Sequence, residues 1–94
     1  METLTKLTDQ AIEQFWETRS EWSEAGGVIQ RTFSFRDFLS SMKFVNQIAE
    51  LAEARQHHPD ILVRYNKVTL SLSTHDAGGI TQKDFDFAAQ ADEV

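Results

Sequence analysis

Cysteine is missing from this chain, which excludes disulfides and metal sites built from thiolates. The chain also has a single proline, four glycines and no long apolar run, so collagen-like repeats, flexible Gly/Pro linkers and membrane-spanning helices are not expected. Residues 1 to 6 do not resemble a signal peptide. These absences favour a soluble protein of the cytoplasm with no membrane partner.

Basic residues are also scarce. Nine Lys and Arg face fifteen Asp and Glu, and the formal net charge is −6. The basic residues are scattered singly, so no patch is available to neutralise phosphates. Direct nucleic-acid binding is therefore not expected.

What remains is an ordinary globular composition, with 40% hydrophobic and 11% aromatic residues in 94 positions. A chain of this length supports one hydrophobic core. We expect a single domain over residues 1–94.

The first half of the chain predicts a helix, a hairpin and a second helix. Thr8 can cap the first helix, whose buried face would carry Ile12, Phe15 and Trp16. A short run near Trp22 and a strand over 28–35 form the hairpin around a Gly pair. Arg31 is the one charge on the apolar side of this strand, so it is either at an edge or paired.

A helix over 36–55 follows, and Ser34-x-x-Asp37 resembles a capping box at its start. Its apolar positions recur every three or four residues, which predicts a buried stripe. The members of this stripe are Phe38, Met42, Val45, Ala49 and Ala52.

Two strands are predicted over 61–65 and 68–74, with a tight turn at Asn66-Lys67 because Asn tolerates positive φ. The second strand alternates, with its apolar side inward and its polar side ending at His75. A last helix opens at Thr81-x-x-Asp84, where Asp84 would complete a capping box. That helix carries the apolar residues Phe85, Ala88 and Ala89.

The order α-β-β-α-β-β-α favours an α+β fold in which one face of a four-stranded antiparallel sheet is covered by three helices. The other face and the edge strands stay open in this arrangement. Pairing of edges between subunits would cover them, so we expect a homodimer.

All three histidines lie between positions 57 and 75. Imidazoles donate and accept protons near neutral pH, so this clustering indicates acid–base chemistry. His57 and His58 could instead cap the preceding helix, and His75 could be an ordinary surface or core histidine. A zinc site is a further alternative, although adjacent His57 and His58 lack the spacing of helical metal ligands.

Neighbouring residues could complete a site. Glu53 lies four residues before His57 and could orient its ring, or simply be solvated. Ser73, Thr74 and Asp76 flank His75 at a strand end, where they could contact a flat heterocycle. Tyr65 is interpreted as a packing residue.

This pattern resembles the signature of the pterin-4a-carbinolamine dehydratases: an acidic residue, His-His-Pro, an aromatic, a second His and an Asp. The matching residues here are Glu53, His57, His58, Pro59, Tyr65, His75 and Asp84. Further agreement spans residues 20 to 90, including Tyr-Asn-Lys-Val at 65–68 and Thr-His-Asp-Ala-Gly-Gly at 74–79.

The resemblance implies a dehydratase that converts 4a-hydroxytetrahydropterin to quinonoid dihydropterin and water, without metal or redox cofactor. It also implies homodimers or homotetramers. The implied catalytic residues are His57, His58 and His75, and the implied substrate contacts are Glu53, Pro59, Ser73, Thr74 and Asp76.

Two other functions stay open. Some members of the family serve as dimerisation cofactors of a transcription factor, so the chain could be a protein interaction module. It could also be a pterin-binding chaperone. The chain departs from the family pattern at Ile61, Val63 and Arg64, which bears on pocket shape and subunit contacts.

Overall fold

The computed structural model describes residues 8–94. The expectation for residues 1 to 6 lies outside this range, as do the side chains of Ile12 and Trp16. The elements, in chain order, are α1 (Asp9–Thr18), β1 (Ser23–Ala25), β2 (Val28–Ser34), α2 (Phe38–Arg55), β3 (Asp60–Arg64), β4 (Lys67–Leu72), the 3₁₀ turn η1 (His75–Ala77) and α3 (Gln82–Asp92). The predicted α+β class and the order of helices and strands are confirmed.

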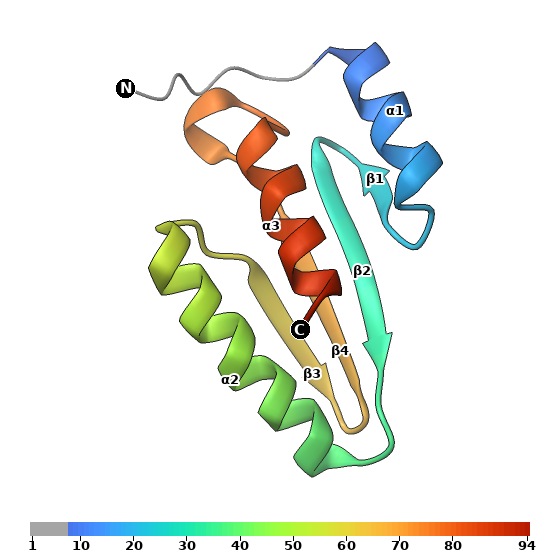
Figure 1. Ribbon diagram of the computed structural model, residues 1–94. Helices are drawn as coiled ribbons and strands as arrows, with labels where there is room; N and C mark the ends of the chain where they lie inside the picture. The colour runs from blue at the N-terminus through green and yellow to red at the C-terminus, as the bar shows by residue number, and fades with distance from the viewer. Residues whose placement is uncertain (1–7) are drawn as a thin grey trace.

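The four strands form one antiparallel sheet in the order β1-β2-β4-β3. Each hairpin pairs locally, and the pairing of β2 with β4 joins the two hairpins. Figure 1 shows β1 beside only one end of β2, whereas β3 runs along the opposite edge. In β3 and β4, Arg64 pairs with Lys67, so the turn is Tyr65-Asn66 and not Asn66-Lys67 as predicted.

Tyr65 takes the positive φ of that turn, at 53°, and it is 67% exposed. The predicted packing role of Tyr65 is therefore wrong. Asn66 instead ties the turn to the end of β2. Its backbone oxygen accepts from the Phe35 N–H at 2.8 Å, and its side-chain amide donates to the Phe35 oxygen at 3.1 Å.

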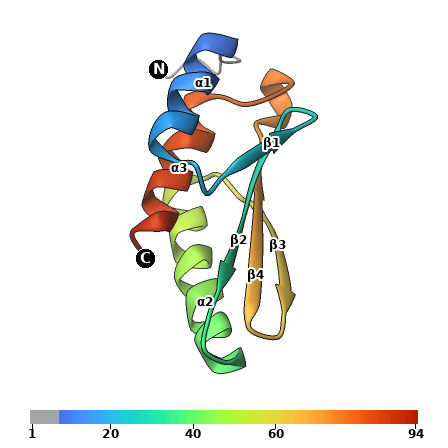
Figure 2. The ribbon, with the colours of Figure 1, turned by 90° about the vertical axis from the view of Figure 1, so that its right-hand side faces the viewer.

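The helices cover one face of the sheet, as Figure 2 shows. On that face β4 buries Val68, Leu70 and Leu72, and β2 buries Ile29. Strand side chains alternate between faces, so the intervening polar residues lie on the uncovered face. Across the core, α1 meets α3 through Phe15 and Phe85, whose rings stack with centroids 3.9 Å apart.

The start and the buried face of α2 differ from the prediction. Asp37, not Ser34, is the N-cap, because its carboxylate accepts the Ser40 N–H at 2.8 Å. That bond to the Ser40 N–H lowers the pKa of Asp37 below its ordinary value of 3.8. The buried residues of α2 are Ser41, Phe44, Ile48 and Ala52, and Phe38 is 47% exposed.

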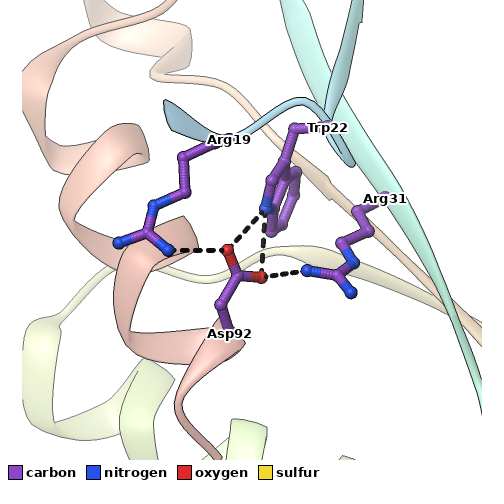
Figure 3. A network of polar contacts seen from close by, with 4 residues as sticks. All are labelled: Arg19, Trp22, Arg31 and Asp92. Atoms are coloured by element: carbon purple, nitrogen blue, oxygen red, sulfur yellow. Dashed lines mark hydrogen bonds and ion pairs between the residues drawn. The ribbon is translucent and has the colours of Figure 1, made fainter. Parts of the chain in front are cut away.

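Asp92, at the end of α3, joins the N-terminal segment to the sheet (Figure 3). Its carboxylate accepts from Arg31 at 2.8 Å, from the Trp22 indole at 3.1 Å and from Arg19 at 3.4 Å. The Arg31 guanidinium also lies 4.4 Å from the centroid of Phe33. The charge on the apolar side of β2 is therefore paired.

In residues 8–94 no helix combines the length and the apolar character needed to span a membrane.

Candidate active site

The end of α2 points His57 and His58 in different directions. Gln56 follows the helix with a left-handed backbone at φ 52°, and its N–H reaches the oxygens of Ala52 and Glu53. The His57 N–H also bonds to the Ala52 oxygen, at 3.1 Å. This Schellman-type ending reverses the chain just before Pro59. The side chains of His57 and His58 therefore reach different partners, Asp84 and Glu53.

His57 is fixed by Asp84 of α3. Its Nε2 lies 2.5 Å from Asp84 Oδ1, and the two side chains are 11% and 0% exposed. The ring also meets the ring of Phe87 edge-on, at a centroid distance of 6.3 Å. With Nε2 engaged, Nδ1 is the His57 nitrogen left for a ligand.

Asp84 itself is held from the other side. Its Oδ2 accepts the Thr81 N–H at 2.9 Å and the Thr74 hydroxyl at 2.9 Å. Thr81 completes the predicted capping box by accepting from the Lys83 N–H. The cap of α3 thus positions the carboxylate that holds His57. Only a capping role was predicted for Asp84.

His58 contacts Glu53, with Nε2 and Oε2 2.6 Å apart. The predicted pairing of Glu53 with His57 is wrong, because the left-handed Gln56 interrupts the helical spacing on which it rested. The two side chains are 59% and 75% exposed, so solvent screens this pair strongly. It orients His58 without much effect on stability.

The third imidazole comes from beyond β4. There Thr74 forms a β-bridge with Gly79, and the 3₁₀ turn η1 lies between these two residues. Thr74 is buried and its hydroxyl lies 2.7 Å from that of Thr81. This connection fixes the base of the segment, while His75 and Asp76 remain exposed.

These elements border an open hollow of about 290 Å³. It is lined by Gln56, His57, His58, Ser73, Thr74, His75, Asp76 and Lys83. All three histidines and the predicted contacts Ser73, Thr74 and Asp76 therefore come together, whereas Glu53 and Pro59 are not in the lining. Gln56 and Lys83 were not predicted, since a lone amide or lysine carries no pattern.

A larger hollow of about 590 Å³ lies at the β3–β4 hairpin, on the uncovered face of the sheet. Its lining consists of Thr32, Leu62, Arg64, Tyr65, Asn66, Lys67 and Thr69. It contains neither imidazole nor carboxylate, and imidazole is the side chain that most often transfers protons in active sites. The smaller, histidine-lined hollow is the candidate active site.

Within residues 8–94 no group of three or more His, Asp or Glu side chains has an arrangement that could hold a metal ion. The hollow offers imidazole, carboxylate, ammonium and hydroxyl groups. Such a set can exchange protons with a polar ligand and hydrogen-bond its edges.

Known proteins resemble this chain over nearly its whole length. A protein of Picosynechococcus sp., provisionally named pterin-4-alpha-carbinolamine dehydratase, is 51% identical over 90 residues, covering 96% of this chain and 98% of its own. A protein of Roseiflexus sp. with the same provisional name is 52% identical over 90 residues, with coverages of 96% and 97%.

Two solved structures share the fold. A protein described as a transcriptional coactivator/pterin dehydratase from Brucella melitensis has a TM-score of 0.90 at 30% identity, covering 95% of this chain and 97% of its own. A pterin dehydratase-like protein described as a RuBisCO assembly factor of the alpha-carboxysome has a TM-score of 0.65 at 20% identity, with coverages of 77% and 83%. The family described as pterin 4 alpha carbinolamine dehydratase matches residues 5–94, and this chain belongs to that family.

Proposed function

We propose that this protein is a hydro-lyase that converts 4a-hydroxytetrahydropterin to quinonoid dihydropterin and water. The reaction would recycle the pterin cofactor of aromatic amino acid hydroxylases. One observation carries the proposal: three imidazoles line a single hollow, and one of them is held by a buried carboxylate. Membership of the carbinolamine dehydratase family agrees with it.

The reaction needs two proton transfers and no change of oxidation state. The bond from C4a to the hydroxyl oxygen breaks as that oxygen is protonated and leaves as water. The N5–H bond releases its proton to a base, and its electron pair forms the double bond between N5 and C4a. Two positioned imidazoles can serve as the acid and the base, each contributing about 10² to 10⁴ in rate.

We assign the proton transfers to His57 and His75. His57 would exchange its proton through Nδ1, because Nε2 is engaged by Asp84. His75 faces the same hollow from beyond β4. His58, held by Glu53, would orient the pterin.

The remaining polar residues of the lining would contact the substrate. Ser73 and Asp76 offer a hydroxyl and a carboxylate to the ring edges, and Thr74, whose hydroxyl is engaged by Asp84 and Thr81, would contact the pterin from the base of the hollow. Pro59 would act indirectly, because its ring fixes the backbone of the segment that joins the end of α2 to β3.

The test is stopped-flow ultraviolet absorbance of chemically generated 4a-hydroxytetrahydropterin. Wild type should accelerate its decay, and His57→Ala should lose about 10²-fold or more of that acceleration. His58→Ala is the matched control, since it removes a neighbouring imidazole that is 59% exposed, and its loss should be smaller. Absence of acceleration by folded wild type would contradict the proposal.

The role of His75 has its own test. An imidazole that transfers a proton in the reaction makes the rate depend on pH, so the wild-type rate should vary with pH near neutrality. His75→Ala should change the shape of this profile as well as its height. An unchanged rate in the variant would remove His75 from the mechanism.

A second candidate function is protein binding. Phe38 and Leu39 on α2 and Ile61 and Leu62 on β3 expose apolar surface. The Brucella relative is described as a transcriptional coactivator as well as a pterin dehydratase. A tight protein partner together with no pterin turnover would favour this function. Pterin binding without turnover would favour a chaperone.

We further propose that the protein acts in the cytoplasm as a homodimer or homotetramer. Edge strand β3 pairs on one side only and carries the exposed Ile61 and Leu62. A second subunit would cover this edge.

A further inference from the structure

Lys83 flanks the proposed catalytic histidine on two sides. It lines the histidine hollow, and with His57 it also lines a small cavity of about 60 Å³ whose other walls are Arg55, Asp86 and Phe87. Its backbone N–H donates to the Thr81 hydroxyl at 3.3 Å, so its Cα is fixed by the cap of α3. The Lys83 side chain thus lies beside His57, and its backbone is held in place by the cap of α3.

The Lys83 ammonium has no carboxylate partner among residues 8–94. Both oxygens of neighbouring Asp84 are engaged, one by His57 and the other by Thr74 and Thr81. Asp86 accepts from the Gln82 amide at 2.9 Å.

Other cations of the described chain are differently placed. Arg19 and Arg31 are paired with Asp92, and Arg36 with Asp37. Lys83 therefore brings a donor without a carboxylate partner to a hollow that otherwise holds imidazoles, hydroxyls, the Gln56 amide and one carboxylate, that of Asp76.

The pyrimidine edge of a pterin presents complementary groups. Its 2-amino group and N3–H are donors, and the neighbouring C4 carbonyl is an acceptor. A carboxylate only accepts and an ammonium only donates, so Asp76 and Lys83 in one hollow match the two halves of this edge. The C4 carbonyl adjoins C4a, the carbon that loses its hydroxyl, which places this acceptor near His57.

On the basis of the proposed function, we propose that Lys83 donates a hydrogen bond to the C4 carbonyl oxygen of the pterin. Lys83 thereby selects 4-oxo pterins against 2,4-diaminopteridines, which carry a donor at that position. With a 2,4-diaminopteridine the Lys83 ammonium would face the 4-amino group, which is a donor. The charge-assisted hydrogen bond to the carbonyl oxygen would then be lost.

Equilibrium binding, followed by the fluorescence of pterin and of 2,4-diaminopteridine, tests this without turnover. At a pH where both ligands are uncharged, wild type should bind pterin at least about tenfold more tightly. Lys83→Met should abolish this preference and Lys83→Arg should retain it. Lys43→Met is the matched control, because Lys43 is an exposed lysine of α2 outside these cavities.

Thermal melting of each variant establishes that it is folded. An unchanged preference in folded Lys83→Met overturns the role of Lys83, even if wild type dehydrates the carbinolamine. Failure of wild type to bind either ligand overturns the proposed function and this inference with it.

Discussion

Asp84 is fully buried and connects the cap of α3 to His57. Replacing Asp84 by Asn keeps the shape of the side chain but exchanges an acceptor oxygen for a donor amide. One of the groups that now bond to the Asp84 carboxylate, on His57, Thr74 or Thr81, would then face an N–H donor. An unsatisfied buried group costs about 1–3 kcal/mol. We expect Asp84→Asn to lower the free energy of unfolding in urea by that amount and the dehydration rate by about 10²-fold.

Asp86→Asn provides the control for this prediction. Asp86 lies on the same helix, is exposed and accepts one hydrogen bond, from Gln82. Its replacement should leave both the urea midpoint and the rate close to those of wild type. An Asp84→Asn protein as stable and as active as the control would show that the contact with His57 is dispensable.

The sequence predicted which residues surround the hollow better than it predicted how they pair. The motif around His57, His58 and His75 was sufficient to expect one site. The bond between His57 and Asp84 joins residues 27 positions apart, so it depends on packing between elements and not on local spacing. The partner of Glu53 was missed because the left-handed residue at the end of a helix is usually Gly. Gln56 takes that conformation here without any such signal in the sequence.

Among the elements, α2 begins at a cap whose strength depends on pH. The pKa of Asp37 is lowered in the folded state, chiefly by the Ser40 N–H, from an ordinary value of 3.8. The stabilisation it gives is therefore fully present above the unfolded-state pKa and is lost as the pH falls through the folded-state pKa. Asn also caps helices well but does not titrate in this range.

We therefore expect the free energy of unfolding of wild type to fall relative to that of Asp37→Asn as the pH drops below 3.8. Urea midpoints of the two proteins at about pH 5 and about pH 2.5 measure this shift. A difference that is the same at both pH values would mean that the cap makes no titrating contribution.

The end of α3 has a comparable role for the N-terminal segment. Asp92→Ala would leave the Arg31 guanidinium and the Trp22 indole without their acceptor in a partly buried position. We expect a loss of about 1–3 kcal/mol in the free energy of unfolding. Glu93→Ala, at an exposed neighbouring position, is the control and should have little effect. Equal urea midpoints for the two variants would contradict a stabilising network.

Sequence patterns placed the helices and strands well and included the buried Ala52 of α2, but they missed Ser41, Phe44 and Ile48 on the same buried face. That face includes Ser41, a polar residue whose hydroxyl bonds to the Asp37 oxygen, so a hydrophobic pattern does not identify it. The β3–β4 turn was shifted by one residue for a similar reason. Asn66 is held by Phe35 of a distant segment, and this tertiary contact decides which residue takes the positive φ.

For the molecule as a whole, the sheet ends at two unequal edges. β1 has three residues and β3 has five, so β3 offers the longer row of unpaired backbone groups. Leu62 lies on it and is 57% exposed. A long edge with apolar side chains favours pairing with another strand, and a lysine on an edge opposes it.

Leu62→Lys should therefore shift the protein from dimer or tetramer towards monomer. Light scattering coupled to gel filtration gives the mass directly, and dilution of each sample shows whether dissociation is reversible. Gln10→Lys, which adds the same charge at an exposed position of α1, should keep the wild-type mass. A wild-type mass for Leu62→Lys would exclude this edge from the interface. Because the histidine hollow is formed within one chain, the monomeric variant should still bind pterin, and that result would separate assembly from catalysis.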